Sequence, residues 1–214
     1  MIKAYYVFQN ASKNLIRTSG MTLSCILILL LAFLSYFFWN IHLFISHWYT
    51  YTINEAASMG PIGIANLISP SGMFLTFFKF ISLLIAILFF INTVSGIRRL
   101  FFQLANDQRP SFLIMSFIGE TTEWISLEFA LQAVYVSFTL LLGGLLIADF
   151  TFGKFLTDLL SIGAFEGIVH SFRSEYRISI VVLILSSLYI GLRVFFFVRK
   201  YLFSFFDSFK ILHI

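Results

Sequence analysis

The chain has 214 residues, of which 59% are hydrophobic and only 11% are charged. Because soluble domains carry roughly a quarter of charged residues, this composition excludes a soluble globular domain and a disordered chain. The net charge is +4 and Cys25 is the only cysteine. We therefore expect no intrachain disulfide and no metal site, and we expect the basic excess to reflect membrane topology rather than nucleic-acid binding.

Residues 1–18 are expected to form an amphipathic elbow helix that lies on the inner membrane surface. Its apolar stripe, at helical spacing, consists of Ala4, Phe8, Ala11 and Leu15. No charged residue occurs between Thr18 and Asn54. Since a bilayer core of roughly 30 Å needs about 20 helical residues, residues 19–48 predict the first transmembrane helix.

The second transmembrane helix is predicted at residues 73–98, a stretch in which Lys79 is the only charged residue before Arg98 at its end. A lysine inside a span is expected to extend toward the membrane surface or to meet an anionic substrate or headgroup. Near the end of the span, Gly96 lacks a side chain and so permits close packing of a neighbouring helix.

Residues 99–124 are expected to form a cytoplasmic coupling segment that contains one short helix. Pro110 suits the first turn of that helix, where its missing N–H is harmless. Gly119 suits the end, because a positive φ costs glycine little. Thr121 or Thr122 is then expected to cap the next helix with its hydroxyl oxygen.

The third transmembrane helix is predicted at residues 125–148, a stretch in which Glu128 is the only charged residue. Gly143 and Gly144 would again allow close helix packing. With the fourth span described next, the expected fold is an all-α integral membrane protein. Its four transmembrane helices and the elbow helix form a single domain over residues 1–214.

Residues 149–177 are expected to form an external amphipathic loop of short helices, and residues 178–199 the fourth transmembrane helix. Arg193 lies inside this last span and is a candidate for an intramembrane charge. One hypothesis is that Glu128 pairs with Arg193 or with Arg109 near the inner interface.

The distribution of lysine and arginine predicts the orientation. Basic residues concentrate on one side of the four predicted spans, the side that carries both termini. They are Lys3, Lys13, Arg17, Arg98, Arg99, Arg109, Arg199, Lys200 and Lys210. Because such residues accumulate in the cytoplasm, both termini are expected there. The predicted location is the cell membrane, as a multi-pass protein of a bacterial inner membrane.

The coupling segment resembles that of the FtsX-like, or MacB-type, permeases of ABC transporters. In this family the segment reads approximately Arg-x-x-Glu-Ile-x-Ile-Leu-x-x-Ile-Gly-Ala-Thr, followed by a Glu and a glycine-rich span. The matching positions are Arg109, Ile114, Met115, Ile118, Gly119, Thr121, Glu128, Gly143 and Gly144. Residues 13–20 also resemble the N-terminal elbow of the family.

Two substitutions and one deletion depart from the family pattern. Ser111 stands where the family has Glu, and Glu120 where it has Ala. Most members also carry a large folded domain between the first two spans, which is here reduced to a short connection.

The resemblance implies a dimeric permease that docks on a separate ATPase subunit. The residues implied in that coupling are Arg109, Phe112, Met115, Ile118, Gly119, Glu120 and Thr121. The chain has no GxxxxGK[ST] motif, so ATP and Mg²⁺ would be bound by the ATPase and no cofactor by this chain. Expected partners are the ATPase, a second permease (the same or a different chain), membrane lipid and a peptide or lipid-like substrate.

Two alternatives differ in class from a transporter. The first is a stand-alone membrane immunity or stress protein that works without an ATPase. The second, more distant, is an intramembrane enzyme that uses Glu120 and Glu123. Both carboxylates are predicted at the start of a helix, where interaction with the helix dipole explains them better than acid–base or metal chemistry.

Overall fold

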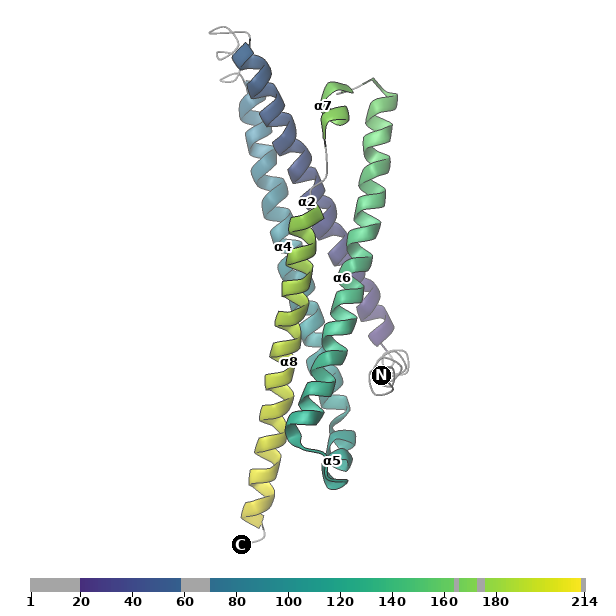
Figure 1. Ribbon diagram of the computed structural model, residues 1–214, viewed down its shortest axis with the longest axis vertical. Coiled ribbons are helices and arrows are strands. Elements are labelled where there is room, and N and C mark those ends of the chain that lie inside the picture. Colours follow the sequence, from purple (N-terminus) through teal and green to yellow (C-terminus); the bar gives the residue numbers. More distant parts are fainter. Residues whose placement is uncertain (1–19, 59–69, 164–165, 173–175, 213–214) are drawn as a thin grey trace. The chain divides into compact units, whose positions relative to one another are not determined.

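The computed structural model describes residues 20–58, 70–163, 166–172 and 176–212. These residues form helices, and no strand is found among them, which confirms the predicted all-α fold (Figure 1). The helices are α2 (Met21–Ser58), α4 (Pro70–Asp107), α5 (Arg109–Phe117), α6 (Thr122–Ser161), α7 (Glu166–Ser171) and α8 (Tyr176–Leu212). The predicted elbow helix at residues 1–18 lies outside the described residues.

Four of the helices are long and apolar enough to cross a membrane, as the sequence predicts. Their candidate spans are Met21–Ala56, Gly72–Asp107, Thr122–Ser161 and Tyr176–Ser204. A stretch of about 20 apolar residues suffices to cross the hydrocarbon core. The length and composition of these helices fit a multi-pass membrane protein.

The helices extend beyond the spans predicted from the sequence. Helix α2 continues to Ser58, α4 to Asp107 and α6 to Ser161. Hydrophobicity sets the shortest helix that can cross a bilayer, whereas a helix ends only where a breaker or cap stops it. After α6 that residue is Gly163, whose φ is +71°. The first part of the predicted external loop is therefore the end of α6.

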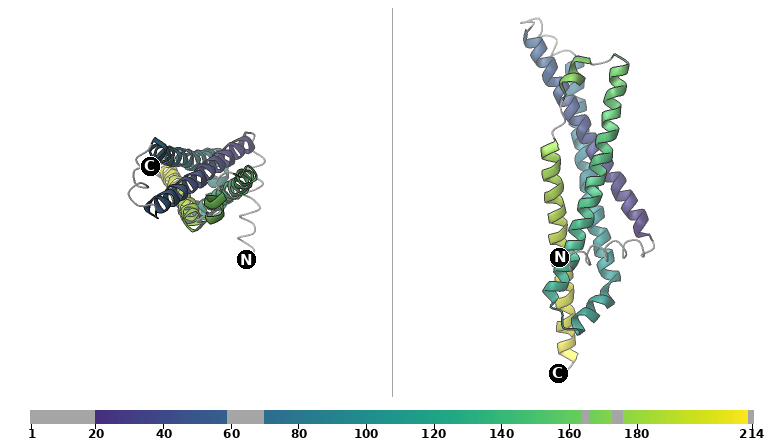
Figure 2. Two further views of the ribbon diagram at one scale, coloured as in Figure 1. Left: turned by 90° about the horizontal axis from the view of Figure 1, so that it is seen from above. Right: turned by 45° about the vertical axis from the view of Figure 1, so that its right-hand side comes forward.

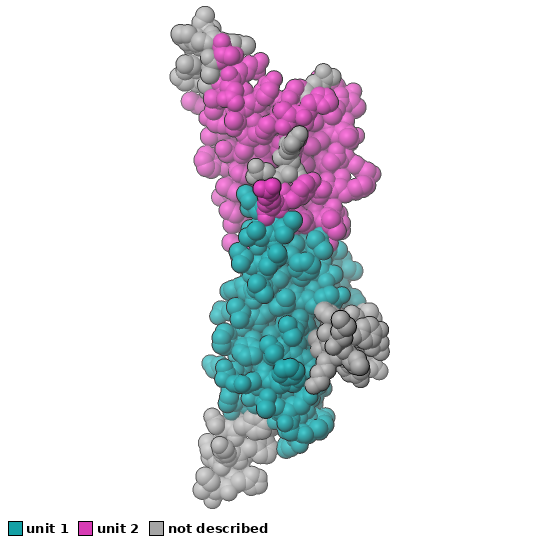
Figure 3. All heavy atoms as spheres, viewed as in Figure 1, with its two compact units in different colours: residues 1–29, 93–142, 178–214 teal, residues 30–92, 143–177 magenta. Residues whose placement is uncertain are grey.

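The chain divides into two compact units (Figure 3). Unit 1 comprises Met1–Leu29, Thr93–Leu142 and Ile178–Ile214, and unit 2 comprises Leu30–Asn92 and Gly143–Arg177. Helices α2, α4, α6 and α8 contribute residues to both units, whereas α5 belongs to unit 1 and α7 to unit 2.

The core of unit 1 is built mainly from α4, α6 and α8. Its largest fully buried side chains are Ile97, Phe101, Ile125, Leu141, Leu183, Ile190, Val194, Val198 and Leu202. Gly191 of α8 allows a close approach to α6, because a Cβ at this position would collide with Val134. Gly96 packs on Ile28, whose Cγ1 would lie 3.3 Å from an added Cβ.

The core of unit 2 is aromatic and attaches α7 to α2 and α6. Phe44, Phe152, Ile168 and Val169 form its buried cluster. Phe172 packs edge-on against Phe44, with ring centroids 5.5 Å apart. Apolar residues of the predicted external amphipathic loop thus contact other helices of unit 2. A hydrogen bond of 2.9 Å between His47 Nε2 and Ser171 Oγ also links α7 to α2.

Gly144 marks a close contact between α6 and α2 in unit 2. A Cβ at this position would lie 2.6 Å from Ala32 Cβ and 3.0 Å from the Ala32 carbonyl carbon. Backbone atoms cannot move aside as a flexible side chain can, so only glycine fits without displacement of α2 or α6. Gly143, next to it, is half-buried.

We predict that Gly144→Ala lowers the free energy of unfolding by about 1–3 kcal/mol, through overpacking against α2. The matched control is Gly153→Ala on the same helix, where an added Cβ meets no atom within 4 Å. That change should be neutral or stabilise by up to about 1 kcal/mol, because alanine favours helix more than glycine does. Unfolding of the purified protein in mixed detergent micelles measures both; equal effects would contradict the close contact.

Candidate functional site

The candidate site is the connection between α4 and α6, where α5 lies beside the first turns of α6 (Figure 1 and the right-hand view of Figure 2). Gln108 alone separates α4 from α5, and Pro110 occupies the first turn of α5, as predicted. The whole predicted coupling segment belongs to unit 1. Its first part, however, is the end of α4 rather than a loop.

A tight turn joins α5 to α6. Gly119 has φ +101°, and its N–H donates to the Ser116 carbonyl oxygen at 3.1 Å. The Glu120 N–H donates to the Met115 carbonyl oxygen, also at 3.1 Å. This pair of bonds is the Schellman motif, which satisfies the last carbonyls of a helix. The predicted role of Gly119 at the end of the helix is confirmed.

Thr121 caps α6. Its Oγ1 accepts a long hydrogen bond of 3.4 Å from the Trp124 N–H, as expected of a residue that precedes the first turn. Glu123 lies in that first turn, where a carboxylate interacts favourably with the helix dipole. Both ends of the turn are therefore fixed by local hydrogen bonds.

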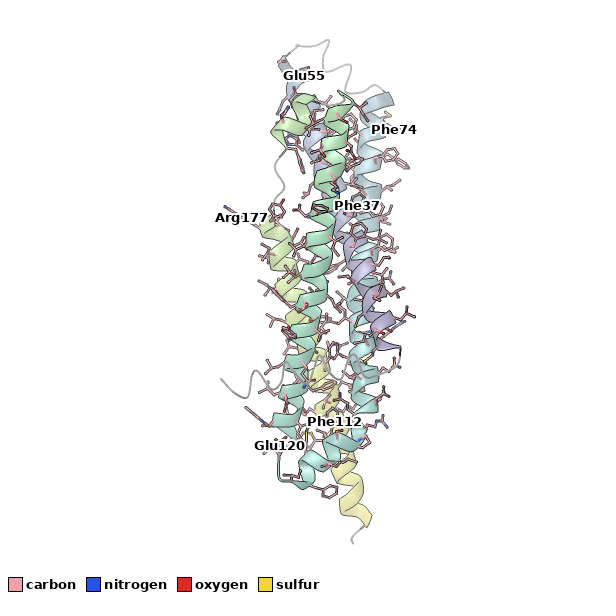
Figure 4. All side chains as sticks on the ribbon, turned by 90° about the vertical axis from the view of Figure 1, so that its right-hand side faces the viewer. Phe37, Glu55, Phe74, Phe112, Glu120 and Arg177 are labelled. Carbon is pink, nitrogen blue, oxygen red and sulfur yellow. The ribbon has the colours of Figure 1, made fainter. Side chains whose placement is uncertain are left out.

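The inner face of α5 is attached to the core by Phe112. This side chain is 4% exposed, and its ring packs edge-on against Phe129 with centroids 5.4 Å apart. Phe129 in turn packs on Phe101 of α4 at 6.0 Å. In Figure 4, Phe112 lies among the helices whereas Glu120 lies at the outer turn. Phe112 thus positions α5 instead of presenting its ring to a partner.

The outer face of α5 and the turn carry three exposed apolar side chains, which we call the α5 tip. They are Ile114, 58% exposed, and Phe117 and Ile118, both 78% exposed. The tip lies between the candidate spans that end at Asp107 and begin at Thr122, not within them. A contiguous group of exposed apolar side chains marks an interaction surface, for another protein or for the membrane.

Polar contacts connect the segment to α8. The Arg109 guanidinium donates to Asn106 Oδ1 at 2.7 Å and lies 4.5 Å from the centroid of the Tyr201 ring. Arg199 forms an ion pair with Glu123 at 3.1 Å. Arg109 is therefore engaged with α4 and α8, although the sequence placed it among the residues that contact the ATPase.

A cavity of about 160 Å³ lies between α5 and α6. Phe112 and Met115 form part of its apolar wall, and Ser111, Glu128 and Gln132 part of its polar wall. The Oε1 atom of Gln132 is buried without a hydrogen-bond partner. The cavity volume corresponds to roughly five water molecules at about 30 Å³ each.

The predicted coupling residues come together in this one segment, but they face different ways. Ile118, Gly119, Glu120 and Thr121 are exposed, Met115 is half-buried and Phe112 is buried. Phe117 and Ile114 lie within the predicted coupling segment, but the sequence pattern singled out neither of them. The sequence did contain a signal for the outer face. Phe117 and Ile118 are apolar residues on either side of the predicted helix end, and they face outward when Phe112 is buried.

The other predicted charges lie elsewhere. The Arg193 guanidinium lies 5.9 Å from the centroid of the Tyr189 ring. Lys79 belongs to unit 2 and is treated below. The pairing of Glu128 with Arg109 or Arg193 stays a prediction. Within the described ranges, no group of three or more His, Cys, Asp or Glu side chains could hold a metal ion.

Comparison with known proteins adds no relative. The sequence matches no protein-family model, and no match is found among the curated proteins or the solved structures. The geometry of the α5 segment therefore carries the functional inference.

We predict that Phe112→Ala and Phe117→Ala differ sharply in their effect on stability. Removal of the buried ring should lower the free energy of unfolding by about 3–5 kcal/mol, whereas the exposed ring should contribute within about 0.5 kcal/mol. Unfolding in detergent micelles, followed by circular dichroism, measures both. A large effect of Phe117→Ala would mean that the α5 tip is buried within the folded chain.

Proposed function

We propose that this chain is the permease subunit of a small ABC transporter, and that the α5 tip docks on a separate ATPase subunit. The observation that carries the proposal is the exposure of Ile114, Phe117 and Ile118 on a helix capped at its end. The resemblance of this segment to that of FtsX-like permeases adds the identity of the partner. ATP and Mg²⁺ would bind to that partner, and the tip would lie in the cytoplasm of a bacterium.

The contacts of α5 are suited to transmit a displacement. Phe112 packs through Phe129 to Phe101, and Arg109 stacks on Tyr201. A force applied to the tip would therefore reach α4, α6 and α8 of unit 1. Since protein cores are closely packed and barely compressible, such contacts pass on a movement rather than absorb it.

The cargo that we propose is a peptide or a lipid-like molecule, and the activity its export or extrusion. Among such activities we favour antimicrobial-peptide export or resistance. A stand-alone immunity or stress protein is the outcome that the next experiment would favour if no ATPase is found.

We predict that an ABC ATPase co-purifies with the wild-type chain from the membranes of its own host, and that Phe117→Ser and Ile118→Ser each lower its recovery at least tenfold. The matched control is Ile162→Ser. Ile162 is 77% exposed and also precedes a glycine of positive φ, but it belongs to unit 2. Quantitative mass spectrometry of the purified complex gives the ratio of subunits. Absence of any ATPase from the wild-type preparation would refute the proposal.

We further propose that a second copy of the chain packs on α4 at Asn92. In the most apolar 18-residue stretch of α4, only 11% of the residues are buried, the lowest share among the four candidate spans. Asn92 is exposed on this helix, where its Nδ2 donates to the Leu88 carbonyl oxygen at 2.9 Å. An asparagine amide has further hydrogen-bonding capacity, and the same residue of a second copy complements it.

We predict that Asn92→Val weakens self-association about 3- to 20-fold, the range expected for one hydrogen bond between membrane helices. Thr139→Val is the control, because Thr139 is also exposed and also donates to a carbonyl four residues before it. Energy transfer between labelled copies in lipid vesicles measures the association. The same affinity in Asn92→Val and wild type would place the dimer contact elsewhere.

A further inference from the structure

Unit 2 contains a groove of about 580 Å³ between one face of α4 and Tyr49 of α2. Pockets that bind small molecules measure about 300–1,000 Å³, so the groove has the capacity of a ligand site. Its apolar lining includes Met73, Phe77, Phe80, Ile81 and Leu84. In Figure 4, Phe74 at the same end of α4 projects away from the helices, which shows how open this helix is.

The groove is elongated along the helix. Met73, Phe77, Phe80 and Leu84 recur at helical spacing on one face of α4. With a rise of 1.5 Å per residue, their span is about 17 Å. One leaflet contributes about 15 Å of the 30 Å hydrocarbon core, so the groove has the length of one extended acyl chain.

The wall of the groove is mostly apolar, and Tyr49 and Thr76 are its side chains with a hydroxyl group. The Thr76 hydroxyl donates to the carbonyl oxygen of Gly72 at 3.0 Å. Phenylalanine and aliphatic side chains supply most of the remaining surface. The ligand part that fits here is therefore a hydrocarbon chain.

Lys79 does not line the groove, but its charge lies close to a residue that does. The Nζ atom of Lys79 is 5.5 Å from the ring centroid of Tyr49, which lines the groove. Within the described part of the chain, Lys79 forms no ion pair. A lysine at this place in a span either extends to the membrane surface or meets an anionic partner, and a lipid or ligand acid group is a partner that the membrane can supply.

The position of Lys79 is fixed by its backbone. Its carbonyl oxygen accepts hydrogen bonds from Nδ1 of His42 on α2 at 2.9 Å and from the Ser82 hydroxyl at 3.0 Å. Because a carbonyl only accepts, His42 must carry its proton on Nδ1 in this contact. The bond holds α2 and α4 at a set spacing beside the groove.

We infer that the groove binds an anionic amphiphile, with its hydrocarbon chain along α4 and its acid group on Lys79. Neutral lipid fits the apolar wall equally well, so the charge of Lys79 is what selects the anion. Binding needs only this chain. That the amphiphile is also the transported cargo rests on the function proposed above.

The test uses the purified chain alone in nanodiscs of phosphatidylcholine, with no ATPase present. The probes are photoreactive hexadecyl phosphate and its neutral counterpart, photoreactive hexadecanol. We expect hexadecyl phosphate to label the α4 peptide around Phe77–Leu84 about fivefold more than hexadecanol does. That ratio corresponds to one lysine acting on an anionic headgroup near the membrane surface.

Variants distinguish the effect of the Lys79 charge on labelling from the effect of the groove's shape. Lys79→Gln should reduce labelling by hexadecyl phosphate to the level of hexadecanol, and Lys79→Arg should retain it. Leu84→Trp, which fills the groove, should reduce labelling by both probes. The matched control is Lys154→Gln, since Lys154 also lies over an aromatic ring, with Nζ 4.7 Å from the Phe150 centroid, but away from this groove.

Equal labelling of the wild type by the two probes would overturn the inference, as would an equal loss in Lys154→Gln and Lys79→Gln. These results are independent of ATPase capture. Selective labelling without a co-purified ATPase would establish a binding site in a protein that is no transporter. An ATPase without selective labelling would leave the transporter with a different cargo.

Discussion

Hydrocarbon offers no hydrogen-bond partner to a backbone N–H or C=O group, and the four long helices follow from this constraint. A chain with 59% hydrophobic residues satisfies it by long continuous helices, and α2, α4 and α6 continue well past the membrane-spanning minimum. Inside the bilayer, association between helices cannot draw on the hydrophobic effect, because lipid is as apolar as the core. Close packing must supply it, and Gly144 and Gly191 allow that packing where each faces another helix.

The α5 segment follows different physics, since it lies between two spans. Its fold depends on local hydrogen bonds around Gly119 and Thr121 and on one buried ring, Phe112. The outer face of α5 therefore has no role in folding. Exposed apolar side chains such as Phe117 persist there at no evident benefit to the folded chain, and this is the basis for assigning the face to a partner.

Composition and local signals predicted a large part of this structure. Four spans follow from charge-free stretches, and the roles of Pro110, Gly119 and Thr121 follow from the conformations that these residues prefer. The ends of the long helices could not be predicted, because hydrophobicity reports what can enter a membrane and not where a helix stops. The inward face of α5 could not be predicted either, since it is set by Phe129 and Phe101, which are remote from it in sequence.

The short connections on either side of α5 restrict how the length of this region can change in evolution. One residue separates α5 from α4, and four residues, from Ile118 to Thr121, separate it from α6. An inserted residue in α5 would rotate everything after it by about 100°, which would bring Phe117 inward or turn Phe112 out. Substitutions can accumulate in this segment one at a time, but its length cannot drift. Homologues of this protein should therefore keep the spacing between Asp107 and Thr122 even where little else of the sequence is retained.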